Sequence, residues 1–396
     1  MTVSPTSALC RLPSDFRVAV IHDWLTGMRG GEAVLEAILD LVPQAELFTL
    51  FHFPGTVSER IESRTIHTSF LQSLARRVRD YRELLPLYPR AARSFDLSRF
   101  DLVISSSHCV AKGVDAKGKP HISYCHTPMR YMWDRFDDYF PRTKPFQRLA
   151  AAAFRPYLQR WDVKTSAGVT EFVANSTFVR DRIKRYYGRD AEVVHPFVDE
   201  AFLQATGNRQ PATAQAGQRT RPTSAGQRTR PTSDEHVIVS ALVPYKRIEL
   251  AIEAIGTRKL VVIGTGPLYD KLKRSAPPNV ELLGYVQRSR IIERLSRARS
   301  LILPGIEDFG ITPLEAMALG TPVVALRAGG VLDSVVEGTT GIFFDDPSVD
   351  ALRRALDDVE SHEWDRAAIR AHAAAFSRAR FDEQFLSVIQ RHGSGR

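Results

Sequence analysis

Short apolar runs that alternate with helix-like segments, in two separate series, restrict the fold of this chain more than any other feature of its sequence. The first series starts with RVAVIH at 17–22, followed by a helical pattern over 32–42, and extends to EFVANS at 171–176. The second starts with HVIVSAL at 236–242 and ends with GIFF at 341–344. Such alternation is typical of parallel strands that helices cover on both faces. Because 396 residues also exceed one ordinary domain, we expect an α/β fold with two lobes facing a central cleft.

A polar segment separates the two series and contains AGQRTRPTS twice in tandem, at 216–224 and 225–233. Its Ser, Thr, Arg and Pro content cannot bury a core, and the repeat is too short for the unit of a solenoid. We interpret it as a disordered linker, with contact of its basic repeats to nucleic acid or lipid as the alternative. We therefore expect an N-terminal lobe over residues 1–195 and a C-terminal lobe over 236–375, joined by an interdomain segment over 196–235. We expect a final helix, over 376–396, that packs back towards the first lobe.

The charge balance favours anionic partners. Lys and Arg number 54 against 45 Asp and Glu, a net charge of +9, which suits nucleotides, nucleic acid or acidic lipid without choosing among them. Scattered cysteines without a Cys-x-x-Cys pair, and a start without a signal-peptide pattern, indicate a cytoplasmic protein. The arginine-rich residues 74–95 are either a solvated helix or a peripheral contact to the anionic inner face of the cytoplasmic membrane.

Two carboxylates in EDFGITPLE, residues 307–315, are the first candidates for chemistry. The preceding SLILP predicts a buried strand, so Glu307 lies at its carboxyl end with no evident structural role. TPLEAMALG predicts a helix with Pro313 at its first position, and Thr312 and Glu315 have the spacing of a capping box. Glu315 therefore has a structural explanation that Glu307 lacks.

The turn inside this motif provides donors for an anion. The amides around Phe309, Gly310 and Ile311 have no partner within the expected helix, so they can bind phosphate at its N-terminus. A carboxylate such as Glu307 can accept hydrogen bonds from vicinal hydroxyls. Acids for hydroxyls and amides for phosphates together indicate a nucleotide-sugar site.

The motif and its surroundings resemble the donor site of retaining family-4 glycosyltransferases. The resemblance rests on the E-x7-E spacing with its internal Phe-Gly, on EAMALGTPVVA and on GGVLDSVVEGTTGIFF, and it extends over most of residues 17–390 except the linker. CHTPMRYMWD at 125–134 is similar to a mannosyltransferase branch of surface-polysaccharide and O-antigen assembly. The resemblance implies a GT-B fold of two Rossmann-like lobes, the first on the acceptor side and the second holding the donor.

The same resemblance assigns roles to individual residues. It implies that Glu307 contacts the donor sugar and that Glu315 binds the ribose of the nucleotide. His126, at the end of an expected strand, corresponds to a family histidine near the donor sugar, although a lone histidine is more often structural. We expect His126 and Glu307 to be the catalytic residues, with Arg130 and Asn175 as further contacts to acceptor or donor.

Basic and glycine residues near strand ends are candidates for binding the diphosphate. Gly30 and Gly31 lie between an expected strand and helix, where backbone amides can approach a phosphate, although an ordinary turn explains them equally. Lys246 and Arg247 follow the first strand of the second lobe and are either diphosphate ligands or solvent-exposed.

One position departs from the family pattern. Family members commonly have an Arg about five residues before Lys246, where this sequence has Ala241. We expect Arg247 to compensate. Gly264 and Gly266, in GTGP, resemble a loop beside the nucleotide base.

These observations predict a retaining glycosyltransferase that moves a hexose, mannose from GDP-mannose, to a hydroxyl of a glycan or lipid-linked glycan. No Asp-x-Asp occurs in the chain, so we expect no metal and no cofactor other than the donor substrate. A two-lobed sugar-nucleotide epimerase or hydrolase is the first alternative. A basic nucleic-acid-binding protein is the second, but the aromatic motifs of RNA-binding sheets do not occur, so nucleic acid is not an expected partner.

Overall fold

The computed structural model describes residues 12–13, 15–78, 80–205 and 233–393. The chain forms two compact units, Met1–Pro196 with Ala379–Arg396, and Phe197–Arg378. Apart from Ser233, the tandem repeat expected to be a disordered linker lies outside the described residues.

The first unit is built on a seven-stranded sheet in the order β3-β2-β1-β4-β5-β6-β7, in which every pairing is parallel. Its central strands consist of continuous apolar or small residues because both faces are covered. The strands are β1 Val18–His22, β2 Glu46–Thr49, β3 Ile66–Thr68, β4 Leu102–Ser107, β5 His121–Cys125, β6 Glu171–Ala174 and β7 Ala191–Val193.

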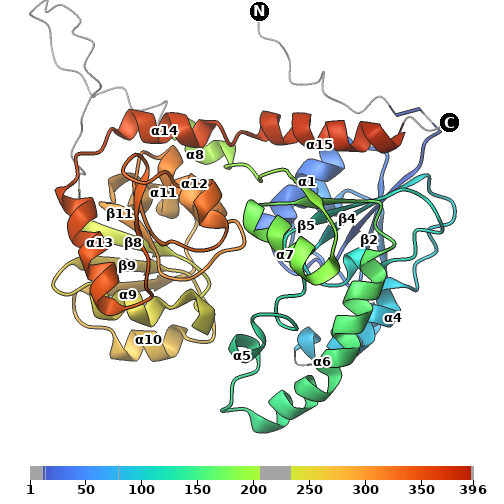
Figure 1. The fold of residues 1–396 in the computed structure, drawn as a ribbon, viewed down its shortest axis with the longest axis horizontal. Helices are drawn as coiled ribbons and strands as arrows, with labels where there is room; N and C mark the ends of the chain where they lie inside the picture. Colours follow the sequence, from blue (N-terminus) through green and yellow to red (C-terminus); the bar gives the residue numbers. More distant parts are fainter. Residues whose placement is uncertain (1–11, 14, 79, 206–232, 394–396) are drawn as a thin grey trace, which may run out of the picture. The chain divides into compact units, whose positions relative to one another are not determined.

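Helices surround this sheet (Figure 1). They are α1 Gly30–Leu41, α2 Glu59–Glu62, α3 Leu71–Ala75, α4 Tyr88–Ala92, α5 Phe136–Tyr139, α6 Pro145–Ser166, α7 Thr177–Tyr187 and α15 Arg378–Gly393, with 3-10 turns η2 Tyr81–Leu87 and η3 Ala111–Gly113. The C-terminal helix α15 packs on this unit through Phe381 and Phe385, whose rings meet that of Tyr124 edge to face. Arg391 near its end pairs with Glu171 at 2.5 Å.

The second unit contains a six-stranded parallel sheet in the order β10-β9-β8-β11-β12-β13. The strands are β8 Glu235–Val239, β9 Lys259–Ile263, β10 Val280–Gly284, β11 Ser300–Leu303, β12 Val323–Leu326 and β13 Gly341–Phe344. The helices are α8 Glu200–Gln204, α9 Ile248–Ala254, α10 Tyr269–Ser275, α11 Arg288–Arg297, α12 Ile311–Ala318, α13 Val349–Ser361 and α14 Arg366–Ala374, with 3-10 turns η4 Pro244–Lys246 and η5 Gly330–Asp333.

Two hydrophobic cores lie on opposite faces of this second sheet. Neighbouring residues of β8 divide between them: Val237 packs in the core that includes α12 and α14, and Ile238 in the core that includes α9 and α13. This alternation follows from the two-residue period of a strand. The expected α/β fold with two parallel-sheet lobes is therefore confirmed.

The strand order of each sheet reverses at one point, which locates the natural ligand site. In the first unit the reversal falls between β1 and β4, and in the second between β8 and β11. The chain leaves these neighbouring strands towards opposite faces, so the loops at their carboxyl ends diverge and leave room for a ligand. Among the described residues, no helix has both the length and the apolar character required to cross a bilayer.

Candidate active site

An ion pair lies at the carboxyl ends of the two central strands of the second unit. Glu307 follows β11 and Lys246 ends η4 after β8, and the Lys246 ammonium pairs with the Glu307 carboxylate. Their side chains are only 12% and 19% exposed. Glu307, for which the sequence showed no structural role, thus has a partner within the protein. Because little water screens it, the pair holds an oriented carboxylate and an oriented cation at the point where the strand order reverses.

The loop that carries Glu307 is held by close backbone approach to Gly329 and Gly330. The Gly330 amide donates to the Glu307 carbonyl at 2.9 Å. A Cβ added at Gly330 would lie 2.1 Å from the Asp308 carbonyl oxygen, so no larger residue fits there without moving the loop. The Gly-Gly of GGVLDS therefore has a specific function, which is to fix the backbone of the Glu307 loop.

Arg247, next to Lys246, has two features that are common at ligand sites. It is a non-glycine residue with a positive φ of 53°, a conformation that costs free energy and persists only where the surroundings impose it. Its Nη1 is buried and has no hydrogen-bond partner among the described residues. A buried guanidinium nitrogen without a partner favours an anion as the missing partner.

Gly264 and Gly266 lie in the loop after β9 and pack closely against the loop after β8. Their φ angles are 140° and 157°. Cβ atoms at these positions would lie 1.8 Å from the Ser240 carbonyl oxygen and 2.4 Å from that of Leu242. The structure thus provides a packing reason for both glycines. Their expected position beside the nucleotide base stays a prediction.

The start of α12 differs from the sequence-based expectation. The helix begins at Ile311, so Pro313 is its third residue, and no side chain caps it. The Thr312–Glu315 capping box is therefore wrong, because Gly310 adopts a φ of +88° that lets the helix begin before Thr312. Phe309 is buried in the core, 3% exposed, which leaves its backbone as the part that can meet a ligand.

Glu315 lies one turn inside α12 and is partly buried. Its carboxyl has no hydrogen-bond or ion-pair partner among the described residues. Burial raises its pKa to about 7, with Asp199 acting in the same direction and Arg288 opposing both. A carboxyl that is costly to ionise and lacks a partner can accept ligand hydroxyls, in agreement with the expected ribose contact, which stays a prediction.

This raised pKa predicts how stability depends on pH. The folded chain keeps the Glu315 proton up to about pH 7, whereas a glutamate in the unfolded chain ionises near pH 4.5. The contribution of Glu315 to stability is therefore lost as pH rises through this window. Glu315→Gln should be more stable than the natural chain near pH 8, by at most about 3 kcal/mol, and equal to it near pH 4.5. Thermal unfolding across this range, with Glu249→Gln as the control at another carboxylate of the same unit, checks it. A stability difference that does not change with pH would contradict the assignment.

In the first unit, four predicted residues lie close together around the end of β5. The Asn175 side-chain amide donates to the His126 carbonyl at 3.0 Å. Gly30 and Gly31 are the first two residues of α1, and a Cβ at Gly31 would lie 3.7 Å from His126 Nε2. The free amides at the N-terminus of α1 therefore lie beside the His126 imidazole.

Sequence reasoning missed a group of buried polar residues around His126. Asp23, fully buried, accepts four backbone N–H bonds, from His108, Cys109, Val110 and Ala111, at 2.7–2.9 Å. It thereby fixes the turn after β4 to the end of β1. The available signal was the polar His-Asp that ends the buried strand RVAVIH, but only the pairing of β1 with β4 brings these residues together.

The Ser106 hydroxyl connects two histidines. Its Oγ lies 3.1 Å from His22 Nδ1 and 2.8 Å from His126 Nε2, and His22 Nε2 lies 3.8 Å from a Glu32 carboxylate oxygen. The carboxylate favours a proton on His22 Nε2, so His22 Nδ1 accepts the single Ser106 proton. Ser106 Oγ must then accept from His126 Nε2–H. This arrangement assigns a bare Nδ1, a hydrogen-bond acceptor, to His126.

His126 is neutral at physiological pH. Burial, with a smaller effect of the nearby His108 and His22, lowers its pKa to about 3 against the opposing charges of Glu32 and Asp23. Arg130 lies in the turn after β5, near enough to contribute to the lowered pKa of His108, which burial chiefly causes. A neutral imidazole with a bare nitrogen can accept a hydrogen bond from a ligand hydroxyl.

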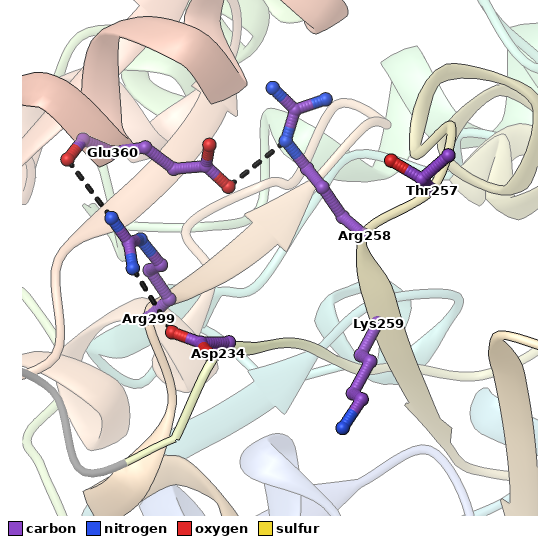
Figure 2. A pocket seen from close by; sticks show the side chains of 6 residues that line it. All are labelled: Asp234, Thr257, Arg258, Lys259, Arg299 and Glu360. Atoms are coloured by element: carbon purple, nitrogen blue, oxygen red, sulfur yellow. Dashed lines mark hydrogen bonds and ion pairs between the residues drawn. The ribbon is translucent and has the colours of Figure 1, made fainter.

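A separate hollow, shown in Figure 2, lies at the opposite, amino-terminal ends of the strands of the second sheet. It has a volume of about 330 Å³ and is lined at the amino ends of strands by Asp234, Lys259 and Arg299. Arg299 pairs with Asp234 at 3.2 Å, so the charges of these two lining residues neutralise each other within the protein.

Among the residues that the structure describes, no group of His, Cys, Asp and Glu is arranged to hold a metal ion.

Comparison with known families agrees with this geometry. Residues 223–376 match the family described as Glycosyl transferases group 1, and residues 45–202 match Glycosyltransferase Family 4. The chain belongs to glycosyltransferase family 4. The two matches divide between the two units, and the first of them includes Lys246, Glu307 and Glu315.

Several curated glycosyltransferases are similar to this chain. A GDP-mannose-dependent alpha-(1-6)-phosphatidylinositol monomannoside mannosyltransferase of Mycolicibacterium smegmatis is 31% identical over 221 residues, which cover 50% of this chain and 54% of that protein. The alpha-1,3/1,6-mannosyltransferase of Neurospora crassa is 24% identical over 70% of this chain and 65% of its own length. The chain thus spans less than two thirds of the length of these curated relatives.

Solved structures of other proteins share the fold over nearly the whole chain. HepE of Anabaena, crystallised with UDP, is 16% identical with a TM-score of 0.64, and the match covers 95% of this chain and 100% of that one. Sucrose-phosphate synthase of Thermosynechococcus elongatus is 14% identical with the same TM-score of 0.64, over 95% and 98%. The GT-B fold expected for a family-4 member is confirmed.

Proposed function

We propose that this protein is a retaining glycosyltransferase that moves mannose from GDP-mannose to a hydroxyl of a glycan or lipid-linked glycan. The observation that carries the proposal is the shielded Lys246–Glu307 pair at the point where the strand order of the second sheet reverses, beside the unpartnered nitrogen of Arg247. One carboxylate and two cations at one site suit a ligand with both hydroxyls and phosphates.

In the proposed reaction, the bond between the sugar C1 and the β-phosphate oxygen breaks, and a bond between C1 and the acceptor oxygen forms on the same face. The acceptor proton passes to the departing phosphate, so no protein base is required. Lys246 and Arg247 stabilise the negative charge on the departing diphosphate, and we assign the same role in the first unit to the amides of Gly30 and Gly31. Glu307 stabilises positive charge that develops on the sugar.

His126 positions the donor sugar in this proposal. Its neutral ring presents Nδ1 as an acceptor for a sugar hydroxyl, because Ser106 engages Nε2. Asn175 holds the backbone of His126 in place. The contribution expected from such positioning is entropic, since the reacting groups are brought into a productive arrangement before the bond breaks.

Mannose is favoured by the names of the relatives. Those of Mycolicibacterium smegmatis and Corynebacterium glutamicum are both called GDP-mannose-dependent mannosyltransferases. A UDP-sugar is the second candidate donor, because HepE, which is 15% identical to this chain, has been crystallised with UDP-glucose. An acceptor linked to lipid is supported by the phosphatidylinositol acceptors in the same relatives' names.

A donor screen by thermal unfolding tests this proposal. A ligand at 100 times its Kd stabilises the folded state by about 2.7 kcal/mol, which should raise Tm by several degrees. We expect GDP-mannose and GDP to do so, and UDP-glucose and ADP-glucose to have little effect. Arg247→Ala should reduce the shift caused by GDP at equal concentration. A shift with UDP-glucose alone would replace the proposed donor, and no shift with any nucleotide sugar would contradict the proposed function.

A further inference from the structure

The helix α6 exposes more large apolar side chains than any other helix in the described part of the chain. Phe146, Leu149 and Tyr157 are 88%, 71% and 49% exposed, and Val163 is 39% exposed. Surface apolar residues are ordinary when scattered, but a continuous group of this size calls for a partner. The group is far larger than the isolated exposed residues elsewhere in the first unit, such as Phe70 and Leu87 at 45% and 37%.

Phe146, Leu149 and Tyr157 lie on a single stripe with helical spacing, and Val163 lies outside it. All members of the stripe are exposed and recur every three or four residues, which places them on one side of the helix. We call this stripe the α6 outer face, and it consists of Phe146, Leu149, Ala150, Ala153, Tyr157, Arg160 and Lys164. It is apolar over about three turns, from Phe146 to Tyr157, and basic at its C-terminal end.

The opposite side of α6 is fixed firmly to the first unit. Lys112 and Asp162 form a buried pair at 3.0 Å, and Asp162 also accepts from the Trp133 indole at 2.8 Å. Leu158 is fully buried. The α6 outer face is thus the exposed side of a helix whose other side is packed against the first unit.

Cations without partners lie at both ends of the α6 outer face. Arg142 and Lys144 precede α6, and Arg160 and Lys164 lie near its end; the side chains of these four exposed residues make no hydrogen bond or ion pair with the described residues. The exposed carboxylate nearest in sequence, Asp137, is neutralised by Arg148 at 2.7 Å. An apolar strip with unpaired positive charge at both ends has the pattern of a surface that binds at an anionic membrane interface.

A shallow hollow beside the stripe has the same character. It has a volume of about 350 Å³, lies between Trp133 and Val163, and is lined almost entirely by apolar atoms although Arg160 and Lys164 contribute to it. Their aliphatic stems therefore face the hollow while their charged ends can reach solvent. Such side chains can cover an acyl chain and bind a lipid phosphate at the same time.

We infer that the α6 outer face binds the surface of an anionic membrane, with Phe146 and Leu149 inserted among the lipids and the four flanking cations on phosphate groups. A second copy of the chain fits less well, because a symmetric contact would bring like charges together at both ends of the helix. The inference goes beyond the proposed reaction and rests on this surface alone.

Vesicle sedimentation of the full chain, without donor or acceptor, tests this inference. We expect binding to vesicles that mix phosphatidylglycerol with phosphatidylcholine, weaker binding at high salt, and little binding to phosphatidylcholine alone. The double variant Phe146→Ser/Leu149→Ser should bind at least about tenfold more weakly, and Arg160→Gln/Lys164→Gln should lose the preference for anionic lipid. Because these side chains are exposed, all variants should keep the natural Tm.

The matched control is Phe70→Ser/Leu87→Ser, which removes two exposed apolar residues from another part of the same unit and should leave vesicle binding unchanged. The inference is overturned if the natural chain does not bind anionic vesicles, or if the control double variant loses binding and the α6 variant does not. A dimer that the α6 variant dissociates, without any vesicle binding, would overturn it in favour of self-association. Donor-induced stabilisation is measured separately, so the proposed function can hold or fail independently.

Discussion

Replacing Glu307 with Gln should lower kcat/KM for transfer roughly 10²–10³-fold, the range typical for loss of one preorganised electrostatic group. The reason is the loss of a fixed negative charge beside the carbon on which positive charge develops. The Lys246–Glu307 pair determines how this experiment is designed. Glu307→Ala would leave the shielded Lys246 ammonium without its partner and add a cost in stability, whereas Gln retains an oxygen that accepts from it.

The control for this variant is Glu249→Gln, which also removes a carboxylate paired with a lysine in the second unit. The Glu249–Lys271 pair is longer, at 3.6 Å, and more exposed, at 35% and 67%. It should contribute little to stability and nothing to the reaction, so its kcat/KM should equal that of the natural chain. Initial rates and thermal unfolding of both variants separate catalysis from stability. Normal turnover by Glu307→Gln would refute the assignment of Glu307 to the reacting sugar.

His126→Ala should reduce kcat about a hundredfold or more, because a neutral ring that positions the sugar is lost. The structure also predicts an effect of Ser106, whose hydroxyl contacts the His126 ring. Ser106→Ala should lower kcat about tenfold, because the His126 tautomer with a bare Nδ1 is no longer enforced. The direct readout is the ¹⁵N chemical shifts of the His126 ring, which should show one neutral tautomer in the natural chain and a mixture in Ser106→Ala.

A matched control for Ser106→Ala exists on the same strand. Ser105 Oγ lies 2.8 Å from Nε2 of His121, both residues are fully buried, and burial also lowers the pKa of His121 to about 3. Ser105→Ala should cost about 1 kcal/mol of stability, as the loss of one buried hydrogen bond does, with an unchanged kcat. Equal effects of the two serine variants on kcat would show that Ser106 acts through stability alone.

All strands of the second sheet and the central strands of the first could be predicted from the sequence, whereas three outer strands of the first sheet could not. Strands such as β4 and β8 are continuous apolar or small runs because helices cover both of their faces. The strands β2, β3 and β7 were missed because they are only three or four residues long and carry polar side chains. Short strands of this kind have no periodicity that distinguishes them from loops.

Motifs located part of the candidate site, whereas contacts between distant segments escaped sequence reasoning. Glu307 was found because its spacing to Glu315 matches a family pattern, but its Lys246 partner depends on the pairing of β8 with β11. In the same way, Ser106 and His22 meet only through the pairing of β1 with β4. Such residues appear in the sequence as polar positions at or after the end of a strand, with nothing to show which of them are neighbours.

The sequence also could not show which segment has exposed apolar residues that could bind a membrane. The arginines of residues 74–95 suggested a membrane contact, but Leu84 and Tyr88 in this segment are buried in the core of the first unit. Only Leu87 remains among the large exposed apolar residues of that segment. The α6 outer face has fewer charges and an alanine-rich composition, so its exposure became evident only once the packing of α6 was known.

The most direct test of the account is the anomeric configuration of the product that the purified protein forms from GDP-mannose and a synthetic glycan acceptor, followed by ¹H NMR. We predict one GDP released for each new glycosidic bond, with the α configuration of the donor preserved. Release of GDP with free mannose would indicate a hydrolase, and conversion of the nucleotide sugar without an acceptor would indicate an epimerase. Either outcome, or a product with inverted configuration, would contradict a retaining transferase built on Glu307 and His126.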